Sequence, residues 1–130
     1  MTIFVDTSAL YGLLDRDDVS HARLTRATGR LLGEDLVTHS YVVVEVVSLV
    51  RRRLGAEAAA RLIDEALPAI EVIDVDASLR ARALAAFRAA VGSGVSFVDR
   101  TSFEFMRQRG IRRAWAVDAD FESEGFELEA

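Results

Sequence analysis

Cysteine and lysine are both absent from this chain, and proline occurs once in its 130 residues. Without cysteine the chain has no disulfide, thiolate nucleophile or cysteine-bound zinc, and this absence fits a reducing compartment. Without lysine, all sixteen basic residues are arginine. Genome composition accounts for such a bias, although arginine also suits bidentate contacts to phosphate. With so little proline and only eight glycines, long flexible linkers are not expected, and we predict one folded domain over residues 1–130.

Targeting and membrane segments are also lacking. The N-terminal sequence MTIFVDTSAL has no basic region and reaches Asp6 almost at once, unlike a signal peptide. The longest apolar run, Tyr41 to Val50, is interrupted by Glu45 and is too short to cross a bilayer. The sequence therefore predicts a soluble cytoplasmic protein without membrane contact.

The charge is unevenly distributed along the chain. The net charge is −5, but six acidic residues and no basic residue lie between Asp118 and the C-terminus. The preceding 117 residues carry 15 acidic residues against 16 arginines. The overall acidity therefore does not exclude a nucleic-acid partner.

Short apolar runs alternate with helical patterns throughout the chain. Strands are predicted at residues 2–5, 36–38, 70–73, 113–117 and 126–128. Helices are predicted at residues 8–14, 20–32, 41–54, 56–67, 76–91 and 97–109. Such alternation is typical of α/β proteins in which a parallel central sheet is flanked by helices.

Capping residues support several of these helices. Thr7, Ser40 and Asp76 each precede a predicted helix and are favoured N-cap types. The segment 41–54 is ambiguous, because its valines have strong β propensity. Arginines in its last turn and Gly55 beyond it favour a helix, which we expect to be buried on most sides. In the helix 76–91 the expected apolar face consists of Leu79, Ala83, Leu84 and Phe87.

Acidic residues stand where the chemistry of an α/β protein is usually found. Asp6 and Asp118 each follow an apolar strand directly, and ligands bind beyond the carboxyl ends of parallel strands. Helix capping is the alternative role for either residue. Glu45 lies among valines, where a buried carboxylate needs a partner; an arginine or a divalent cation would serve.

A fourth acid, Asp99, opens the helix at 97–109, where a capping or helix-dipole role is the alternative. The hydroxyl of Thr101 can bond a carboxylate or a metal-bound water, or Thr101 can simply start the helix, which is the role expected for Ser102. The two histidines, His21 and His39, are expected at the surface or as caps.

Taken together, the four acids predict a cation site. Oxygen ligands without cysteine favour Mg²⁺ or Mn²⁺ over zinc or copper. Clustered carboxylates repel one another, so their pKa values should be raised until a cation binds. Such a site typically activates water for the cleavage of phosphate esters and needs no histidine or serine nucleophile.

Four motifs, in order along the chain, resemble a known family. They are VDTSAL, VVVEVVSLV, SFVDRTSFEFMRQRGI and AWAVDADF. This series resembles the PIN domain and, within it, the VapC-type toxins of bacterial toxin–antitoxin (VapBC) systems, over nearly the whole chain. The resemblance implies a PIN-like three-layer α/β fold and a metal-dependent endoribonuclease that uses Mg²⁺ or Mn²⁺. It also implies an RNA substrate, a VapB-type antitoxin as partner, and a homodimer.

The resemblance carries over residue by residue. It implies that Asp6, Glu45, Asp99 and Asp118 hold the metal and carry out catalysis. It also implies supporting roles for Ser8 and for Asp120, where Asp120 is an alternative to Asp118 as the direct fourth ligand.

RNA has to approach an acidic centre, so positive charge at its rim would help. Arg100, Arg51 and Arg52 are the principal candidates; Arg53, Arg107, Arg109, Arg112 and Arg113 are further ones. A solvated helix face is the alternative for each of them. Trp115 is expected in the core, with stacking on a base as its alternative.

Other α/β enzymes also place acids at strand ends. Response-regulator receivers need a lysine, and haloacid-dehalogenase-type phosphatases need a second aspartate at the position of Ser8. Phosphate-binding loops of the GxxxxGK and GxGxxG types are absent. A non-catalytic PIN-like RNA- or protein-binding module and a DNA nuclease remain as alternatives to the ribonuclease.

Overall fold

The computed structural model describes residues 1–129. Within them, five parallel strands form one sheet in the order β3-β2-β1-β4-β5. The strands are β1 (Thr2–Val5), β2 (Asp35–His39), β3 (Glu71–Ile73), β4 (Arg113–Trp115) and β5 (Glu127–Leu128). The predicted parallel α/β architecture is confirmed. Because all pairs are parallel, the carboxyl ends of the strands meet at one edge of the sheet.

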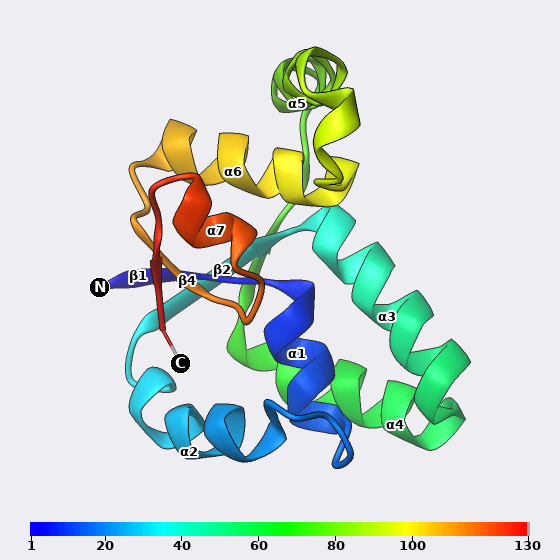
Figure 1. Ribbon diagram of the computed structural model, residues 1–130. Helices are drawn as coiled ribbons and strands as arrows, with labels where there is room; N and C mark the ends of the chain where they lie inside the picture. Colours follow the sequence, from blue (N-terminus) through cyan, green and yellow to red (C-terminus); the bar gives the residue numbers. More distant parts are fainter. Residues whose placement is uncertain (130) are drawn as a thin grey trace.

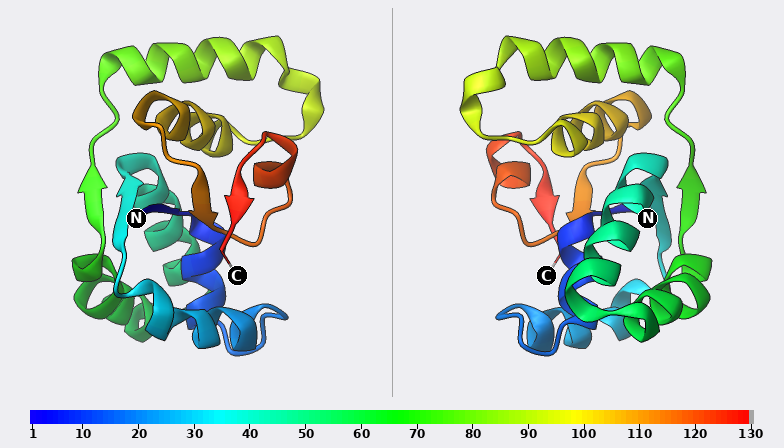
Figure 2. Two further views of the ribbon diagram at one scale, coloured as in Figure 1. Left: turned by 90° about the vertical axis from the view of Figure 1, so that its left-hand side faces the viewer. Right: turned by 90° about the vertical axis from the view of Figure 1, so that its right-hand side faces the viewer.

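Helices cover the sheet on both sides (Figures 1 and 2). The helices are α1 (Thr7–Leu14), α2 (His21–Leu31), α3 (Ser40–Leu54), α4 (Ala56–Arg61), α5 (Ala77–Ala89), α6 (Phe97–Arg109) and α7 (Asp120–Ser123). In Figure 1, α6 and α7 lie above the sheet, and α1, α2 and α4 lie below it. Helix α5 packs on the outer side of α6, away from the sheet. In the part of the chain that is described, no helix is long and apolar enough to cross a membrane.

Strand β1 occupies the centre of the sheet and of the core. Its residue Phe4 pairs with Val37 of β2 on one side and with Ala114 of β4 on the other. The Phe4 ring is fully buried, with its centroid 5.7 Å from Phe105 and 6.2 Å from Phe121. A strand covered on both faces needs a continuous apolar run, which explains the sequence that precedes Asp6.

Two of the three predicted N-caps are wrong. Asp6, not Thr7, caps α1 by accepting a hydrogen bond from the backbone nitrogen of Ser8 at 3.1 Å. His39, not Ser40, caps α3, because its imidazole accepts from the first backbone N–H groups of that helix. The predicted cap of α5 by Asp76 is confirmed, with a bond of 2.8 Å from Leu79 N.

Three helical segments differ from what the sequence predicts. Helix α3 is buried along one face only, since Val44 is 66% exposed. In α5, Leu79 and Ala83 face the core, whereas Leu84 points outward and is 51% exposed. The helix predicted over 56–67 is α4 followed by a π-helical turn, Leu62–Ala66, and a 3₁₀ turn, Leu67–Ala69, that contains the only proline.

Candidate metal centre

The sheet and two helices bring the four predicted acids to one pocket. Asp6 follows β1, Asp118 follows β4, Glu45 lies on α3 and Asp99 on the first turn of α6. All four line a pocket of about 510 Å³ at the carboxyl edge of the sheet. The topology explains the convergence, because β1 and β4 are neighbours and end at the same level.

A larger pocket, of about 840 Å³, lies at the opposite edge of the sheet. The first residues of all five strands, Thr2, Asp35, Glu71, Arg113 and Glu127, contribute to its walls, and the four acids do not. Larger volume alone does not make it the better candidate, because the perturbed carboxyl groups lie in the smaller pocket.

Asp6 is buried and only partly satisfied. Its carboxylate is 3% exposed, and Oδ2 accepts hydrogen bonds from the hydroxyl and the backbone nitrogen of Ser8, at 2.6 and 3.1 Å. Its Oδ1 has no hydrogen-bond partner among residues 1–129. Burial raises the pKa of Asp6 to about 6, against the lowering effect of the Ser8 hydrogen bonds. Charges on Glu45 and Asp118 raise this pKa further.

The Ser8 hydroxyl also accepts a hydrogen bond from the backbone nitrogen of Val117, at 3.1 Å. Ser8 therefore ties Asp6 to the segment that leads into Asp118. The supporting role of Ser8 stays a prediction, and these hydrogen bonds are consistent with it.

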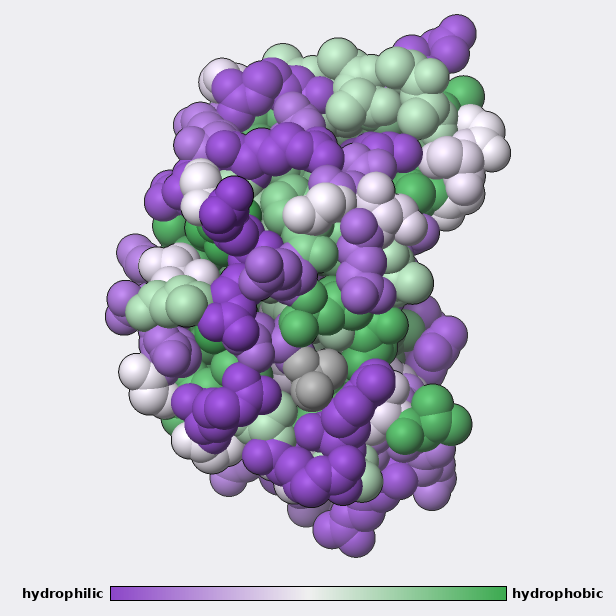
Figure 3. Space-filling model, turned by 60° about the vertical axis from the view of Figure 1, so that its left-hand side comes forward, coloured by the Kyte–Doolittle hydropathy of each residue, from purple (hydrophilic) through white to green (hydrophobic). Residues whose placement is uncertain are grey.

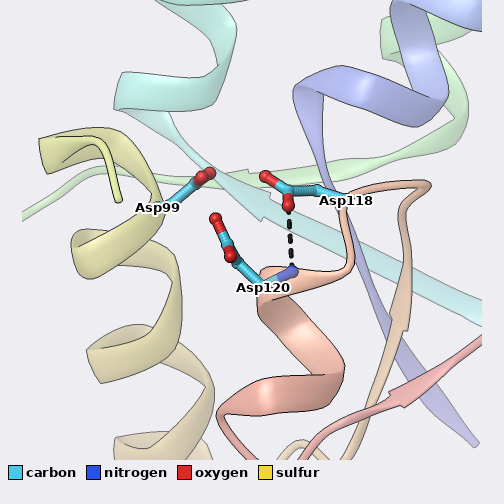
Figure 4. Close-up of side chains that lie close together, drawn as sticks. All are labelled: Asp99, Asp118 and Asp120. Atoms are coloured by element: carbon cyan, nitrogen blue, oxygen red, sulfur yellow. Dashed lines mark hydrogen bonds between the residues drawn. The ribbon is translucent and has the colours of Figure 1, made fainter. Parts of the chain in front are cut away.

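Three aspartates form the most compact cluster (Figure 4). Asp99, Asp118 and Asp120 each offer a carboxylate oxygen, and these oxygens lie within 4.8 Å of one another. The backbone nitrogen of Asp120 donates to Asp118 Oδ1 at 2.9 Å, which fixes the start of α7 beside the acid. Burial, and then the charge of Asp6, raise the pKa of Asp99 to about 8, and Asp118 contributes as well. The charge of Asp118 is the main cause of a raised Asp120 pKa.

Glu45 is half-buried on the wall of the same pocket. Within the described residues no arginine forms an ion pair with it, so the salt-bridge alternative is not what the structure shows. The hydroxyl of Thr101 donates to the carbonyl of Phe97 at 2.9 Å rather than to a carboxylate. Thr101 therefore supports the first turn of α6 and not an acid directly.

Two further side chains differ from the sequence interpretation. His39 caps its helix as one alternative had it, but it is fully buried rather than at the surface. Its Nε2 lies 2.9 Å from the hydroxyl of Ser102, which was expected only as a helix-start residue. Thr7 was missed as a wall residue: it lines the pocket, and its buried hydroxyl has no partner in the described chain.

The candidate arginines fall into two groups. Arg52 and Arg53 line the acid pocket, whereas Arg51 is exposed on the same turn of α3 but is not part of the pocket wall. Arg100 is only 12% exposed, and its guanidinium lies 3.4 Å from Glu124. Arg107 is paired with Glu104 and Glu124. The other candidates lie away from the acids, because Arg109, Arg112 and Arg113 line the opposite pocket, where Arg113 also pairs with Glu127 and Glu129.

The residues present fit a hard divalent cation. Asp6, Glu45, Asp99 and Asp118 all offer carboxylate oxygens to this pocket, the ligand type that such ions prefer. The orphaned Asp6 Oδ1 is a buried acceptor that a cation would satisfy, and the raised pKa values show charge repulsion that a cation would relieve.

A model of the PIN domain family matches residues 3–126. This chain belongs to the PIN-domain family. It is 34% identical over 125 residues to the 23S rRNA-specific endonuclease VapC20 of Mycobacterium tuberculosis, and the match covers 95% of both chains. The crystal structure of VapC20, described as a Sarcin-Ricin loop cleaving toxin, has a TM-score of 0.86 and the same 95% coverage of each chain. The resemblance to VapC-type PIN domains is thereby confirmed.

More distant PIN-domain neighbours share the fold alone. FitAcB from Neisseria gonorrhoeae is 17% identical, with a TM-score of 0.72 over 100% of this chain and 97% of the neighbour. VapBC2 from Rickettsia felis, bound to a DNA fragment from its promoter, is 14% identical, with a TM-score of 0.71 over 99% and 98%. The three-layer PIN arrangement predicted from the motifs is therefore confirmed.

Proposed function

We propose that this protein is a Mg²⁺- or Mn²⁺-dependent endoribonuclease and the toxin of a VapBC-type pair. The observation that carries the proposal is a convergence of acids. Carboxylate oxygens of Asp99, Asp118 and Asp120 lie within 4.8 Å of one another, and Asp99 and Asp118 line the same pocket as Asp6 and Glu45. The activity of VapC20, a relative along almost the full chain, supports the same reaction.

Asp6, Glu45, Asp99 and Asp118 would hold the cation, with Asp120 as a direct or water-mediated ligand. The bound cation would supply an activated water and stabilise charge on the phosphate. Ser8 holds Oδ2 of Asp6 through two hydrogen bonds and leaves Oδ1 without a partner in the described chain. A raised pKa at Asp99 lets this carboxyl hold a proton near neutral pH until the cation displaces it.

RNA is the proposed substrate, and ribosomal RNA is the first to test because VapC20 is specific for 23S rRNA. The proposed site of action is the cytoplasm, where ribosomes are found.

Two protein partners belong to the proposal. A VapB-type antitoxin is supported by neighbours solved as VapBC assemblies from Rickettsia felis and Salmonella typhimurium. A homodimer is supported by apolar side chains left outside the core, such as Leu84 and Val91, which are 51% and 56% exposed. Figure 3 shows a weakly apolar surface at the top of the molecule, where Figure 1 places α5.

Cleavage of total RNA and of intact ribosomes by antitoxin-free protein tests the proposal. We expect discrete fragments with Mg²⁺ or Mn²⁺, none with EDTA, and none with Asp99→Asn. Asp64→Asn, an exposed acid in the turn after α4, is the matched control and should cleave like the wild type. Folded wild-type protein that leaves every RNA intact would favour a binding module, and equal cleavage of single-stranded DNA would favour a general nuclease.

A further inference from the structure

The pocket that contains the acids also has a basic side. Arg52 and Arg53, from the last turn of α3, and Tyr11, from α1, line the pocket together with Asp6 and Asp99. Helices α1 and α3 pack against each other, which brings the tyrosine to the arginines although they are far apart in sequence. The wall of the pocket therefore carries guanidinium groups as well as carboxylates, among which is also Asp18.

Arg53 is held by an aromatic ring. Its guanidinium carbon lies 5.7 Å from the centroid of the Tyr11 ring, a distance typical of a cation–π contact. The ring itself is fixed, because the Tyr11 hydroxyl donates a hydrogen bond of 2.7 Å to Asp15 at the end of α1. A guanidinium carries five N–H donors, more than its contacts with Tyr11 can use, so Arg53 can still bind another acceptor.

The charge on this side is not neutralised by the protein. Within residues 1–129, neither Arg52 nor Arg53 forms an ion pair with a carboxylate, whereas Arg100 and Arg107 are both paired with Glu124. A favourable interaction with the helix dipole explains why arginines occur in the last turn of α3. It does not explain why Arg53 is fixed over a tyrosine in the wall of the acid pocket.

We propose that Tyr11 and Arg53 form a phosphate clamp that binds the RNA backbone next to the phosphate being cleaved, with Arg52 as a second cation. This inference rests on the proposed ribonuclease function. An acidic centre repels the phosphates of RNA. A fixed cation beside the carboxylates would offset this repulsion where the RNA enters the pocket. A guanidinium also matches two phosphate oxygens at once, and the tyrosine ring keeps it from folding over onto the carboxylates.

Binding of RNA to a variant that does not cleave it tests the clamp. In an Asp99→Asn background, Arg53→Ala should weaken binding of a labelled single-stranded RNA oligonucleotide roughly 10-fold and lower the slope of log K against log salt by about one. Arg51→Ala is the matched control, because it removes the same charge from the same turn outside the pocket. It should change affinity and slope clearly less than Arg53→Ala.

The tyrosine separates a clamp from a general charge effect. Tyr11→Phe keeps the ring and should bind RNA nearly as the background protein does, whereas Tyr11→Leu should lose a large part of what Arg53→Ala loses. Thermal melting of each variant checks the fold. If Arg53→Ala binds RNA like Arg51→Ala, or if Tyr11→Leu binds like Tyr11→Phe, the clamp is disproved.

Two further measurements distinguish this proposal from the function on which it rests. If the wild type cleaves RNA and Arg53→Ala cleaves and binds like Arg51→Ala, the ribonuclease stands and the clamp falls. If the wild type never cleaves RNA while Arg53→Ala still weakens RNA binding selectively, the clamp stands and the catalytic assignment falls. Poly-L-glutamate serves as a competitor without phosphate. If it displaces the labelled RNA as well as unlabelled RNA of equal charge does, the assignment to phosphate is overturned and an acidic protein partner is indicated.

Discussion

The Nε2 atom of His39 lies 2.9 Å from the hydroxyl oxygen of Ser102 inside the core. On the other side of the ring, Nδ1 accepts from the backbone nitrogens of Tyr41 and Val42, at 3.2 and 3.4 Å. Because Nδ1 accepts, the proton of the neutral ring is on Nε2, which donates to Ser102. One imidazole therefore joins α3, which carries Glu45, to α6, which carries Asp99.

Replacing this histidine should destabilise the fold without altering the acids. His39→Phe keeps an aromatic ring in the core but loses the cap of α3 and one partner of Ser102. We expect the free energy of unfolding to fall by about 2 kcal/mol, from a lost cap and a lost buried hydrogen bond. Ser102→Ala, which loses only the second of these, should cost about half as much. Urea unfolding measures both, and equal stability of His39→Phe and the wild type would contradict the coupling.

The same histidine gives the stability a definite dependence on pH. Burial lowers the pKa of His39 to about 4 from its ordinary value near 6.5, so the folded state binds fewer protons than the unfolded state between these values. The free energy of unfolding contributed by His39 is therefore complete above pH 6.5 and falls as the pH drops toward about 4. In His39→Phe this loss should be absent, as unfolding at a series of pH values will show.

The carboxyl groups of the pocket act with the opposite sign. The pKa values of Asp6 and Asp99 are raised, to about 6 and about 8, so the folded state without metal binds more protons than the unfolded state. The contribution of these carboxyl groups to stability should therefore decrease as the pH rises from about 4 to about 8, by at most ~1.4 kcal/mol per pH unit for each group. Below pH 6.5 the opposite change at His39 offsets part of this decrease. Above pH 6.5 the His39 contribution is constant, so the decrease between pH 6.5 and about 8 comes mainly from Asp99, with a smaller part from Asp6.

Divalent cations should reverse this decrease. A cation that binds the ionised carboxylates of the folded state alone adds stability, and it does so more strongly as the pH rises. We expect the melting temperature in EDTA to fall between pH 6.5 and 8, and to level or rise with excess Mg²⁺ or Mn²⁺. Asp99→Asn should flatten the curve in EDTA. A wild-type melting temperature that ignores both pH and metal would contradict the site.

The contact between Arg100 and Glu124 should affect how tightly Asp120 can bind a cation. Glu124 pairs with Arg100 at 3.4 Å and with Arg107 at 2.8 Å, and so fastens the end of α7 to α6. In Glu124→Gln the freed Arg100 guanidinium can turn to Asp120, whose pKa it already lowers. We expect roughly 10-fold weaker Mn²⁺ binding by calorimetry, as for other residues that orient metal ligands.

Glu122 provides the matched control for this prediction, because it is exposed on the same short helix. Glu122→Gln should bind Mn²⁺ like the wild type. Equal affinity of the two variants would show that the ion pair of Glu124 has no part in the site.

The acidic C-terminal segment contributes to stability through one buried residue. Glu129 is 5% exposed and pairs with Arg30 of α2 at 2.7 Å and with Arg113 of β4. Glu129→Gln should lower the free energy of unfolding by about 2 kcal/mol, because two charged hydrogen bonds lose their acceptor charge. Glu127→Gln is the control: its carboxylate is 74% exposed and 3.8 Å from Arg113, so the change should be small. Similar midpoints in urea for both variants would rule out the buried pair as a stabilising contact.

Sequence reasoning reached the acids of the site because of the regular topology of the fold. An acid directly after an apolar strand has to stand at the carboxyl edge of a parallel sheet, and this alone placed Asp6 and Asp118 together. Glu45 was more difficult, because valine-rich sequence favours strand, and Arg51 to Arg53 with Gly55 were needed to indicate a helix.

Which arginines lie near the acids could not be predicted in this way. Arg100 was favoured because it follows Asp99 in the sequence, but adjacent side chains on a helix point about 100° apart. The structure turns Arg100 toward Glu124, while Arg53, eight residues after Glu45, faces the acids through the packing of α3 on α1. This packing leaves no local pattern in the sequence, because its residues meet only in the folded chain. The imidazole cap is local, since His39 accepts from Tyr41 and Val42, but histidine is not a favoured N-cap type and the neighbouring Ser40 is.

Asp6 serves the fold with one carboxylate oxygen and the pocket with the other. Asparagine caps helices as well as aspartate does, and one base change converts one codon into the other. A single mutation can therefore remove a proposed cation ligand and leave α1 capped. Under the proposed function, such a descendant would be a folded but inactive protein rather than a misfolded chain.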